Sequence, residues 1–128
     1  MIDHISVGVS DLDRSATFYE ATLAALGLTR LVTRPRTVGF GKAYPEFWIN
    51  LREGMPRVAP ESGVHICLRA KTTAEVDAFH VAALSAGGAS DGAPGIRPHD
   101  RVRYYAAFVV DPDGNRIEAV TFPRQEER

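Results

Sequence analysis

The 128-residue chain has little of several features that mark particular protein classes. Its single cysteine, Cys67, excludes an internal disulfide and a zinc site built from cysteines alone. No apolar run approaches the roughly 20 residues that span a bilayer, and the N-terminus lacks the pattern of a signal peptide. Fifteen basic and sixteen acidic side chains leave a formal charge of −1, too small to attract nucleic acid or an anionic membrane. We therefore expect a cytoplasmic protein with neither of those partners.

The composition is that of a folded domain. Hydrophobic residues make up 45% of the chain and charged residues 24%, which excludes disordered and fibrous classes. A chain of this length buries roughly two-thirds of its unfolded surface when it folds, enough for a core without disulfides. We expect one domain over residues 1–128.

The two halves of the chain repeat one pattern at an offset of 65 − 4 = 61 residues. Histidine, phenylalanine and glycine all recur at this offset without a gap, which chance matches in an alanine-rich sequence do not explain. Two copies of one unit indicate a pseudo-symmetric pair, because a solenoid needs three or more repeats. The identical pairs include His4/His65, Ile5/Ile66, Phe18/Phe79, Leu23/Leu84 and Gly27/Gly88.

Each half predicts a strand, a helix and three further strands, a βαβββ module. Apolar and polar residues alternate with period two at 5–9 and 64–68, as in half-buried strands. Helices are expected over 11–25, with Ser10 as N-cap, and from Thr72 or Thr73 to residue 86. Further strands are expected at 29–33, 37–41, 46–51, weakly at 89–91, then at 103–110 and 116–122. The modules span about 1–54 and about 63–123, joined by a linker at 52–63.

Strand alternation places three possible metal ligands on the faces that turn away from the helices. His4 lies opposite the apolar positions of the first strand, His65 occupies the same place in the second module, and Glu118 is on the last strand. Each alone is typical of a solvated side chain, but symmetric pairing of the modules would aim all three at one concavity. Two imidazoles and a carboxylate leave positions on Zn, Fe, Ni, Mn or Co where two substrate oxygens can bind.

The sequence resembles the vicinal oxygen chelate superfamily, which includes glyoxalase I, extradiol dioxygenases, fosfomycin-resistance transferases and bleomycin-binding proteins. The resemblance covers nearly the whole chain, and its most specific part is the closing Asp-Pro-Asp-Gly-Asn-x-Ile-Glu run. It implies an α+β fold in which two paired βαβββ modules form a cupped mixed sheet around a divalent ion, with His4, His65 and Glu118 as ligands. The matching segments lie at 3–7, 10–15, 18–19, 26–28, 63–66 and 108–118.

Departures from the resemblance narrow the activity that it implies. Glyoxalase I has a fourth ligand on the last strand of its first module, where this chain offers Trp48 and Asn50 as wall residues for substrate. The extradiol pattern has a tyrosine where this chain has Phe108, although His99 and Tyr104 remain candidates for acid–base catalysis. The fosfomycin type needs a cationic cluster for its phosphonate, for which Arg97, Arg101 and Arg103 are candidates.

These observations predict a metal-dependent lyase, isomerase, dioxygenase or transferase that acts on a small oxygenated molecule. The alternative is a non-catalytic drug- or metabolite-binding protein whose walls include Trp48, Phe108 and Tyr104. A relative that kept the fold and lost its chemistry is a third reading, suggested by Phe108. A homodimer is expected, because modules of this family pair within a chain or between chains. In the second case His4 and His65 of one site come from different subunits.

Overall fold

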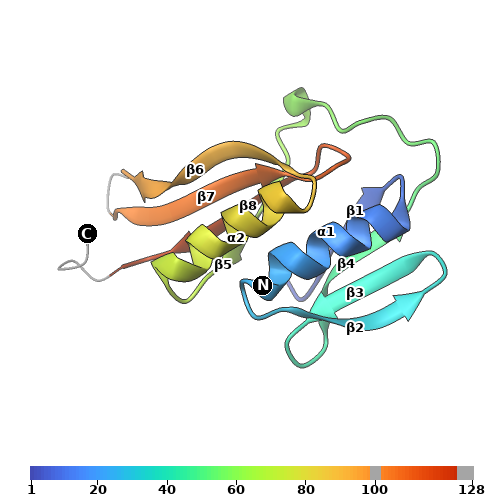
Figure 1. Cartoon of the computed structure of the whole chain (residues 1–128), viewed down its shortest axis with the longest axis horizontal. Helices are drawn as coiled ribbons and strands as arrows, with labels where there is room; N and C mark the ends of the chain where they lie inside the picture. The colour runs from blue at the N-terminus through green and yellow to red at the C-terminus, as the bar shows by residue number, and fades with distance from the viewer. Residues whose placement is uncertain (99–101, 124–128) are drawn as a thin grey trace.

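The computed structural model describes residues 1–98 and 102–123. Its order of elements is the predicted one, with a strand, a helix and three strands in each half (Figure 1). The first module contains β1 (Ile5–Val9), α1 (Leu12–Ala24), β2 (Thr29–Arg34), β3 (Thr37–Gly41) and β4 (Pro45–Leu51). The second contains β5 (His65–Arg69), α2 (Thr73–Ser85), β6 (Ala89–Arg97), β7 (Tyr104–Val110) and β8 (Arg116–Thr121). A 3₁₀ turn, Pro60–Ser62, lies in the linker.

Each module folds into its own four-stranded mixed sheet. The strand order is β1-β4-β3-β2 in the first sheet and β5-β8-β7-β6 in the second. In both, the first strand runs parallel to the last and the other pairs are antiparallel. The predicted α+β class, with two βαβββ modules, is therefore confirmed. Among the described residues, hydrogen-bonded strand neighbours occur only within a module, so the two sheets of one chain remain separate.

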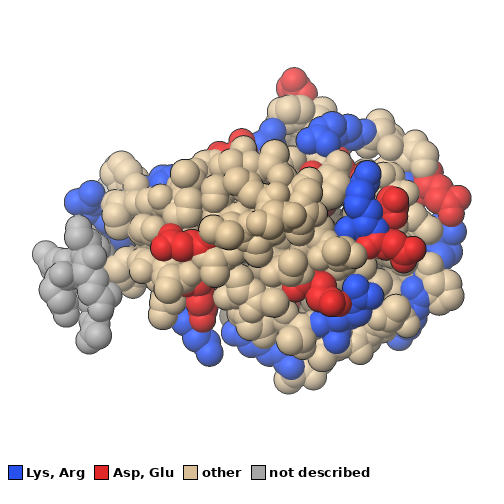
Figure 2. Space-filling model, viewed as in Figure 1, with Lys and Arg blue, Asp and Glu red and all other residues tan. Residues whose placement is uncertain are grey.

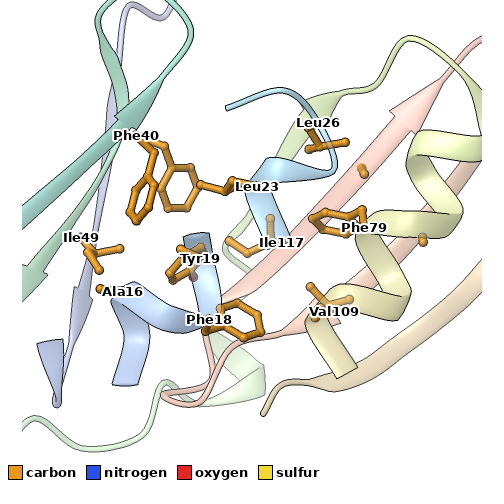
Figure 3. Packing of buried hydrophobic residues seen from close by; sticks show 14 of the residues in the cluster. Ala16, Phe18, Tyr19, Leu23, Leu26, Phe40, Ile49, Phe79, Val109 and Ile117 are labelled. Carbon is orange, nitrogen blue, oxygen red and sulfur yellow. The ribbon is translucent and has the colours of Figure 1, made fainter. Parts of the chain in front are cut away.

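The two helices join the modules through one hydrophobic core. Helix α1 packs on β3 and β4, α2 packs on β6 and β7, and the helices lie against each other (Figure 1). Phe18 of α1 and Phe79 of α2 are fully buried, as their matching repeat positions predict, and both reach toward the second sheet (Figure 3). Burying a phenylalanine stabilises a fold by roughly 1.5–3 kcal/mol. The helix-bearing faces of both sheets are thus used for stability, which leaves the opposite faces for ligands.

The start of α1 differs from the prediction. Asp11, not Ser10, is the N-cap, and its side chain accepts a hydrogen bond from the Arg14 amide at 3.1 Å. Ser10 instead donates its amide and its hydroxyl to Asp113, at 3.0 and 2.5 Å. An aspartate caps as well as a serine, so the tertiary bond to Asp113 decides between them. In the second module Thr72 caps α2 as expected, accepting from the Glu75 amide.

Strand β6 is much longer than the short piece predicted at 89–91. It runs from Ala89 to Arg97, through a segment that its glycines and Pro94 mark as a loop by composition. The ladder with β7 is irregular, with register shifts between Ser90 and Gly95. An edge strand tolerates proline and bulges because one of its sides needs no partner. The sheet edge therefore explains a strand that local propensity does not predict.

Charged side chains of both signs are interspersed on the face that carries the helices (Figure 2). Among the described residues on that face, no large region of one sign appears, in agreement with the near-zero net charge. Within residues 1–98 and 102–123, neither helix is long and apolar enough to cross a membrane.

Candidate metal and substrate site

Two of the three predicted metal ligands meet on the second sheet. His65 begins β5, Glu118 lies on the neighbouring strand β8, and both side chains are on the face turned away from α2. The ring nitrogen Nε2 of His65 is 3.0 Å from Oε1 of Glu118. An imidazole and a carboxylate at this distance are typical partners for a divalent ion.

Glu118 is the protected member of this pair. Its side chain is only 7% exposed, whereas that of His65 is 51% exposed. Cys67 lies directly opposite Glu118 in the β5–β8 register. Desolvation, together with the negative charge of Glu118, raises the pKa of the Cys67 thiol to about 12. Cys67 therefore remains a neutral thiol at pH 7, which argues against a nucleophilic role.

His4 lies on the other sheet. It immediately precedes β1, and Oδ2 of Asp3 is 2.8 Å from its Nδ1. The Tyr44 hydroxyl donates to the other oxygen of Asp3 at 2.8 Å, and these two hydrogen bonds hold the pKa of the Asp3 carboxyl below its usual value. A carboxylate on Nδ1 orients a histidine and leaves Nε2 for a metal. No group of three possible ligands forms in the part of the chain that the structure describes, so one chain does not bring His4 to His65 and Glu118.

Trp48 takes the place on the first sheet that Glu118 takes on the second. In the strand register, Trp48 lies opposite Ser6 of β1, and Glu118 lies opposite Cys67 of β5. Ser6 and Cys67 occupy equivalent positions of the two modules, because they are separated by the repeat offset. The indole covers Gly39, where an added Cβ would lie 2.8 Å from the ring. Because tryptophan occupies this position, the first module supplies no carboxylate at the place of the fourth glyoxalase I ligand.

An open groove of about 530 Å³ surrounds Trp48, and we call it the Trp48 groove. Asn50, the other predicted wall residue, lies in it, and Oδ1 of Asn50 is 2.6 Å from the Thr37 hydroxyl. This volume lies within the range of small-molecule sites, about 300–1,000 Å³. The groove is lined by His4, Ser6, Arg34, Thr37, Tyr44, Pro45, Trp48 and Asn50.

The remaining candidates lie on the second sheet or outside the described residues. Phe108 pairs with Glu118 in register, and its ring centre is 6.4 Å from that of His65. Tyr104 lines a groove with Cys67 and Glu118, which puts it on the same face of the sheet as Glu118. His99 lies outside the residues that the structure describes, as does Arg101.

Sequence reasoning missed several polar partners of the predicted residues. Asp3 orients His4, and the adjacent Asp-His pair in the sequence was a usable signal for this. Tyr44 reaches Asp3 across 41 residues, and no local pattern indicates that contact. Arg97 was a candidate for charge only, but its guanidinium lies 5.5 Å from the centre of the Phe108 ring.

Comparison with known proteins agrees with this architecture. The family model of the Glyoxalase/Bleomycin resistance protein/Dioxygenase superfamily matches residues 1–119. The chain belongs to this superfamily. A glyoxalase/bleomycin resistance protein from Albidiferax ferrireducens T118 is similar over 92% of this chain and 96% of its own, with 32% identity and a TM-score of 0.82.

More distant members of the glyoxalase superfamily share the fold. A glyoxalase-related enzyme from Fulvimarina pelagi has 19% identity and a TM-score of 0.72, covering 94% of this chain and 86% of its own. A glyoxalase I mutant from Zea mays has 22% identity and a TM-score of 0.69, covering 91% of this chain and 45% of its own. None of the curated proteins searched matches the chain.

Proposed function

We propose that this glyoxalase-superfamily chain is a divalent-metal-dependent enzyme that works as a homodimer. Each site takes His65 and Glu118 from one subunit and His4 from the partner subunit. The observation that carries the proposal is the 3.0 Å pairing of His65 with the buried Glu118, while His4 lies on a separate sheet. A second copy that presents its first sheet to the second sheet of this chain would complete the ligand set.

Completion within one chain is disfavoured by the way the modules are joined. The groove that contains His4 is separate from the groove that contains His65 and from the groove that contains Glu118. The helices pack against each other, and Asn115 donates to the Gly8 carbonyl at 3.0 Å across the modules. Moving the sheets together in one chain would break these contacts between the modules, whereas association of two chains preserves them.

The donor set suits a catalytic ion with open positions. Two neutral imidazoles and one carboxylate leave room for two substrate oxygens, and the bound ion would supply Lewis-acid stabilisation to the charge that develops on them. Glu118 contributes a charge that burial keeps from being screened by water. With Nδ1–H of His4 donating to Asp3 at 2.8 Å, the lone pair of Nε2 would be available to the ion. Trp48 and Phe108 form aromatic walls for a small oxygenated substrate.

The second candidate is a non-catalytic binding protein. Phe108 favours it, because the ring lies directly opposite Glu118 and carries no hydroxyl for proton transfer. Tyr104, at the start of the same strand, is the phenol that would have to replace such a group. Ligand affinity that is unchanged by a chelator would favour this reading over the enzymatic one.

Metal content of defined dimers tests the proposal. His4→Ala and His65→Ala are purified without chelator, each alone and as a heterodimer isolated through two different tags. Each single variant should lose its metal, whereas the heterodimer should regain one ion per dimer, because one of its two sites has no mutated residue. His80→Ala is the control, since His80 bonds Ser90 beside α2 and belongs to neither ligand-bearing face.

Other metal contents would contradict the proposal. If the heterodimer contained as little metal as the two single variants, each site would have to lie within one chain. Equal metal content in wild type and His65→Ala would show that His65 does not bind the ion, and the proposed site would be wrong.

A further inference from the structure

A row of hydrogen-bond donors crosses the first sheet beside Trp48. Arg34 pairs with Thr37 and Thr37 with Asn50 in the strand register, so the three side chains share one face. We propose that this row binds the anionic group of a small molecule whose flat ring stacks on Trp48. The ligand class is therefore a ring that carries a carboxylate or a phosphonate. The claim that this ligand is the substrate rests on the proposed function. Binding of the ligand at Arg34 and Trp48 does not require the metal.

Arg34 differs from its neighbouring arginines because it has no acidic partner among the described residues. Arg30 on the same strand bonds Glu20 at 2.6 Å, and Arg36 in the hairpin turn bonds Glu53 at 3.3 Å. Within residues 1–98 and 102–123, Arg34 makes no ion pair, and its guanidinium lies 5.8 Å from the centre of the Trp48 ring. That distance is near the outer limit of a cation–π contact, so the group is held close to the ring while its donors remain available.

Asn50 adds a second donor beside Arg34. Its Oδ1 is occupied by the Thr37 hydroxyl at 2.6 Å, and that hydroxyl also lies 3.0 Å from the Ile49 carbonyl oxygen. The amide nitrogen of Asn50 has no hydrogen-bond partner among the described residues. A guanidinium fork and an amide N–H group, fixed on adjacent strands, match the oxygens of a carboxylate or phosphonate.

Trp48 provides a stacking surface with a fixed position. Gly39 lies beneath the indole so closely that even a methyl group there would meet the ring at 2.8 Å. The indole is thus held against the sheet, and it also lines the Trp48 groove. Offset stacking of a flat ring on the indole adds favourable contact that a small aliphatic anion would not gain.

Within one subunit, the described lining of the groove lacks negative charge that would repel an anion. None of the residues that line it is an aspartate or a glutamate, in the part of the chain that the structure describes. Asp3 is close to two lining residues, but its oxygens already accept from His4 and Tyr44. A neutral or cationic ligand would leave the Arg34 charge without a partner, whereas an anion would satisfy it.

Trp48 is the only tryptophan of the chain, so its fluorescence reports directly on this groove. The full-length protein, with EDTA present, is titrated with benzoate, phenylphosphonate, neutral benzyl alcohol and inorganic phosphate. We expect the two aromatic anions to bind at least about tenfold more tightly than benzyl alcohol or phosphate. The tighter of benzoate and phenylphosphonate identifies the oxyanion, and both results support the site.

Variants assign the binding to Arg34. Arg34→Ala should weaken the aromatic anions about tenfold or more, and Arg34→Lys should recover only part of the loss because it lacks the fork. Arg36→Ala is the matched control, since Arg36 is two residues away but paired with Glu53, and it should change affinity less than twofold. Equal affinity for benzoate and benzyl alcohol, or an unchanged affinity in Arg34→Ala, would overturn the proposal.

The outcome is separable from that of the metal experiment. Aromatic-anion binding with no metal in the wild-type protein would leave a binding protein of this ligand class. Metal bound across subunits with no anion binding would leave the enzyme and reject this class of substrate.

Discussion

The Tyr19 hydroxyl donates a 2.6 Å hydrogen bond to Oδ2 of Asp111, and so joins helix α1 of the first module to the β7–β8 turn of the second. Tyr19 is fully buried and Asp111 is 1% exposed. The other oxygen of Asp111 accepts the amides of Asp113 and Asn115, which shape the turn itself. The closing motif of the sequence therefore does more than end a hairpin, since it fixes how the two modules are held together.

Removing this hydroxyl should destabilise the protein without altering its fold. Tyr19→Phe keeps the ring contacts with Phe18 and Phe47, but it deletes one bond to a buried carboxylate. We expect the free energy of unfolding to fall by about 1–3 kcal/mol. Urea denaturation at a fixed protein concentration measures this, and an unchanged midpoint would show that the inter-module bond contributes nothing.

The same pair predicts a loss of stability in alkali. Burial, and then the negative charge of Asp111, raises the pKa of Tyr19 well above its ordinary value of about 10. Below pH 10 both folded and unfolded states hold the proton, so the full contribution is present. Above pH 10 the unfolded state ionises first, and stability should fall by about 1.4 kcal/mol more per pH unit in wild type than in Tyr19→Phe. Parallel denaturation curves of both proteins from pH 9 to 11 check this, and identical slopes would contradict it.

Asp113 is expected to make a second stabilising connection between the modules. Its carboxylate accepts the Ser10 amide and hydroxyl, and Arg14 approaches it at 3.4 Å. Asp113→Ala would leave the Ser10 amide unpaired and should lower the unfolding free energy by about 1–3 kcal/mol. Asp13→Ala, an exposed first-turn residue of α1, should cost less than about 1 kcal/mol. Equal losses in the two variants would show that Asp113 acts only as a surface charge.

Gly39→Ala should displace the tryptophan of the Trp48 groove. The new Cβ would lie 2.8 Å from the indole and 3.0 Å from the Pro45 side chain, so the ring must move away from the sheet. We expect a loss of about 1–3 kcal/mol and emission at longer wavelength, as the indole becomes more hydrated. Gly95→Ala meets only the end of the flexible Arg97 side chain and serves as the control. An unshifted spectrum in Gly39→Ala would contradict the packing described.

Glu118→Gln separates the charge of this residue from its shape. The amide can still reach His65 across 3.0 Å, and it removes a buried charge, so stability should be maintained or increased. Metal affinity should fall by at least about tenfold, because a neutral amide is a weaker ligand than a carboxylate. Metal analysis combined with thermal unfolding tests both parts. Wild-type metal content in Glu118→Gln would exclude Glu118 from the ligand set.

The amino-acid sequence determined the elements and the sorting of residues between faces. Period-two alternation separates the buried Val9 and Ile117 from the candidate ligand positions, because successive side chains of a strand point to opposite sides. The repeat offset predicted the equivalent places of His4 and His65. Alternation along a strand and repetition at a fixed offset are properties of the sequence itself, and so they can be predicted without the tertiary structure.

Tertiary structure alone decided which of these residues meet. His65 reaches Glu118 because β5 and β8 are parallel neighbours, although 53 residues separate the pair. His4 does not join them, because the packed helices and the hydrogen bonds of Asp111, Asp113 and Asn115 hold the modules with their sheets apart. The capping role of Asp11 and the long edge strand β6 depended in the same way on distant partners. Local pattern assigns a face to a side chain, but only the packing of modules decides what that face meets.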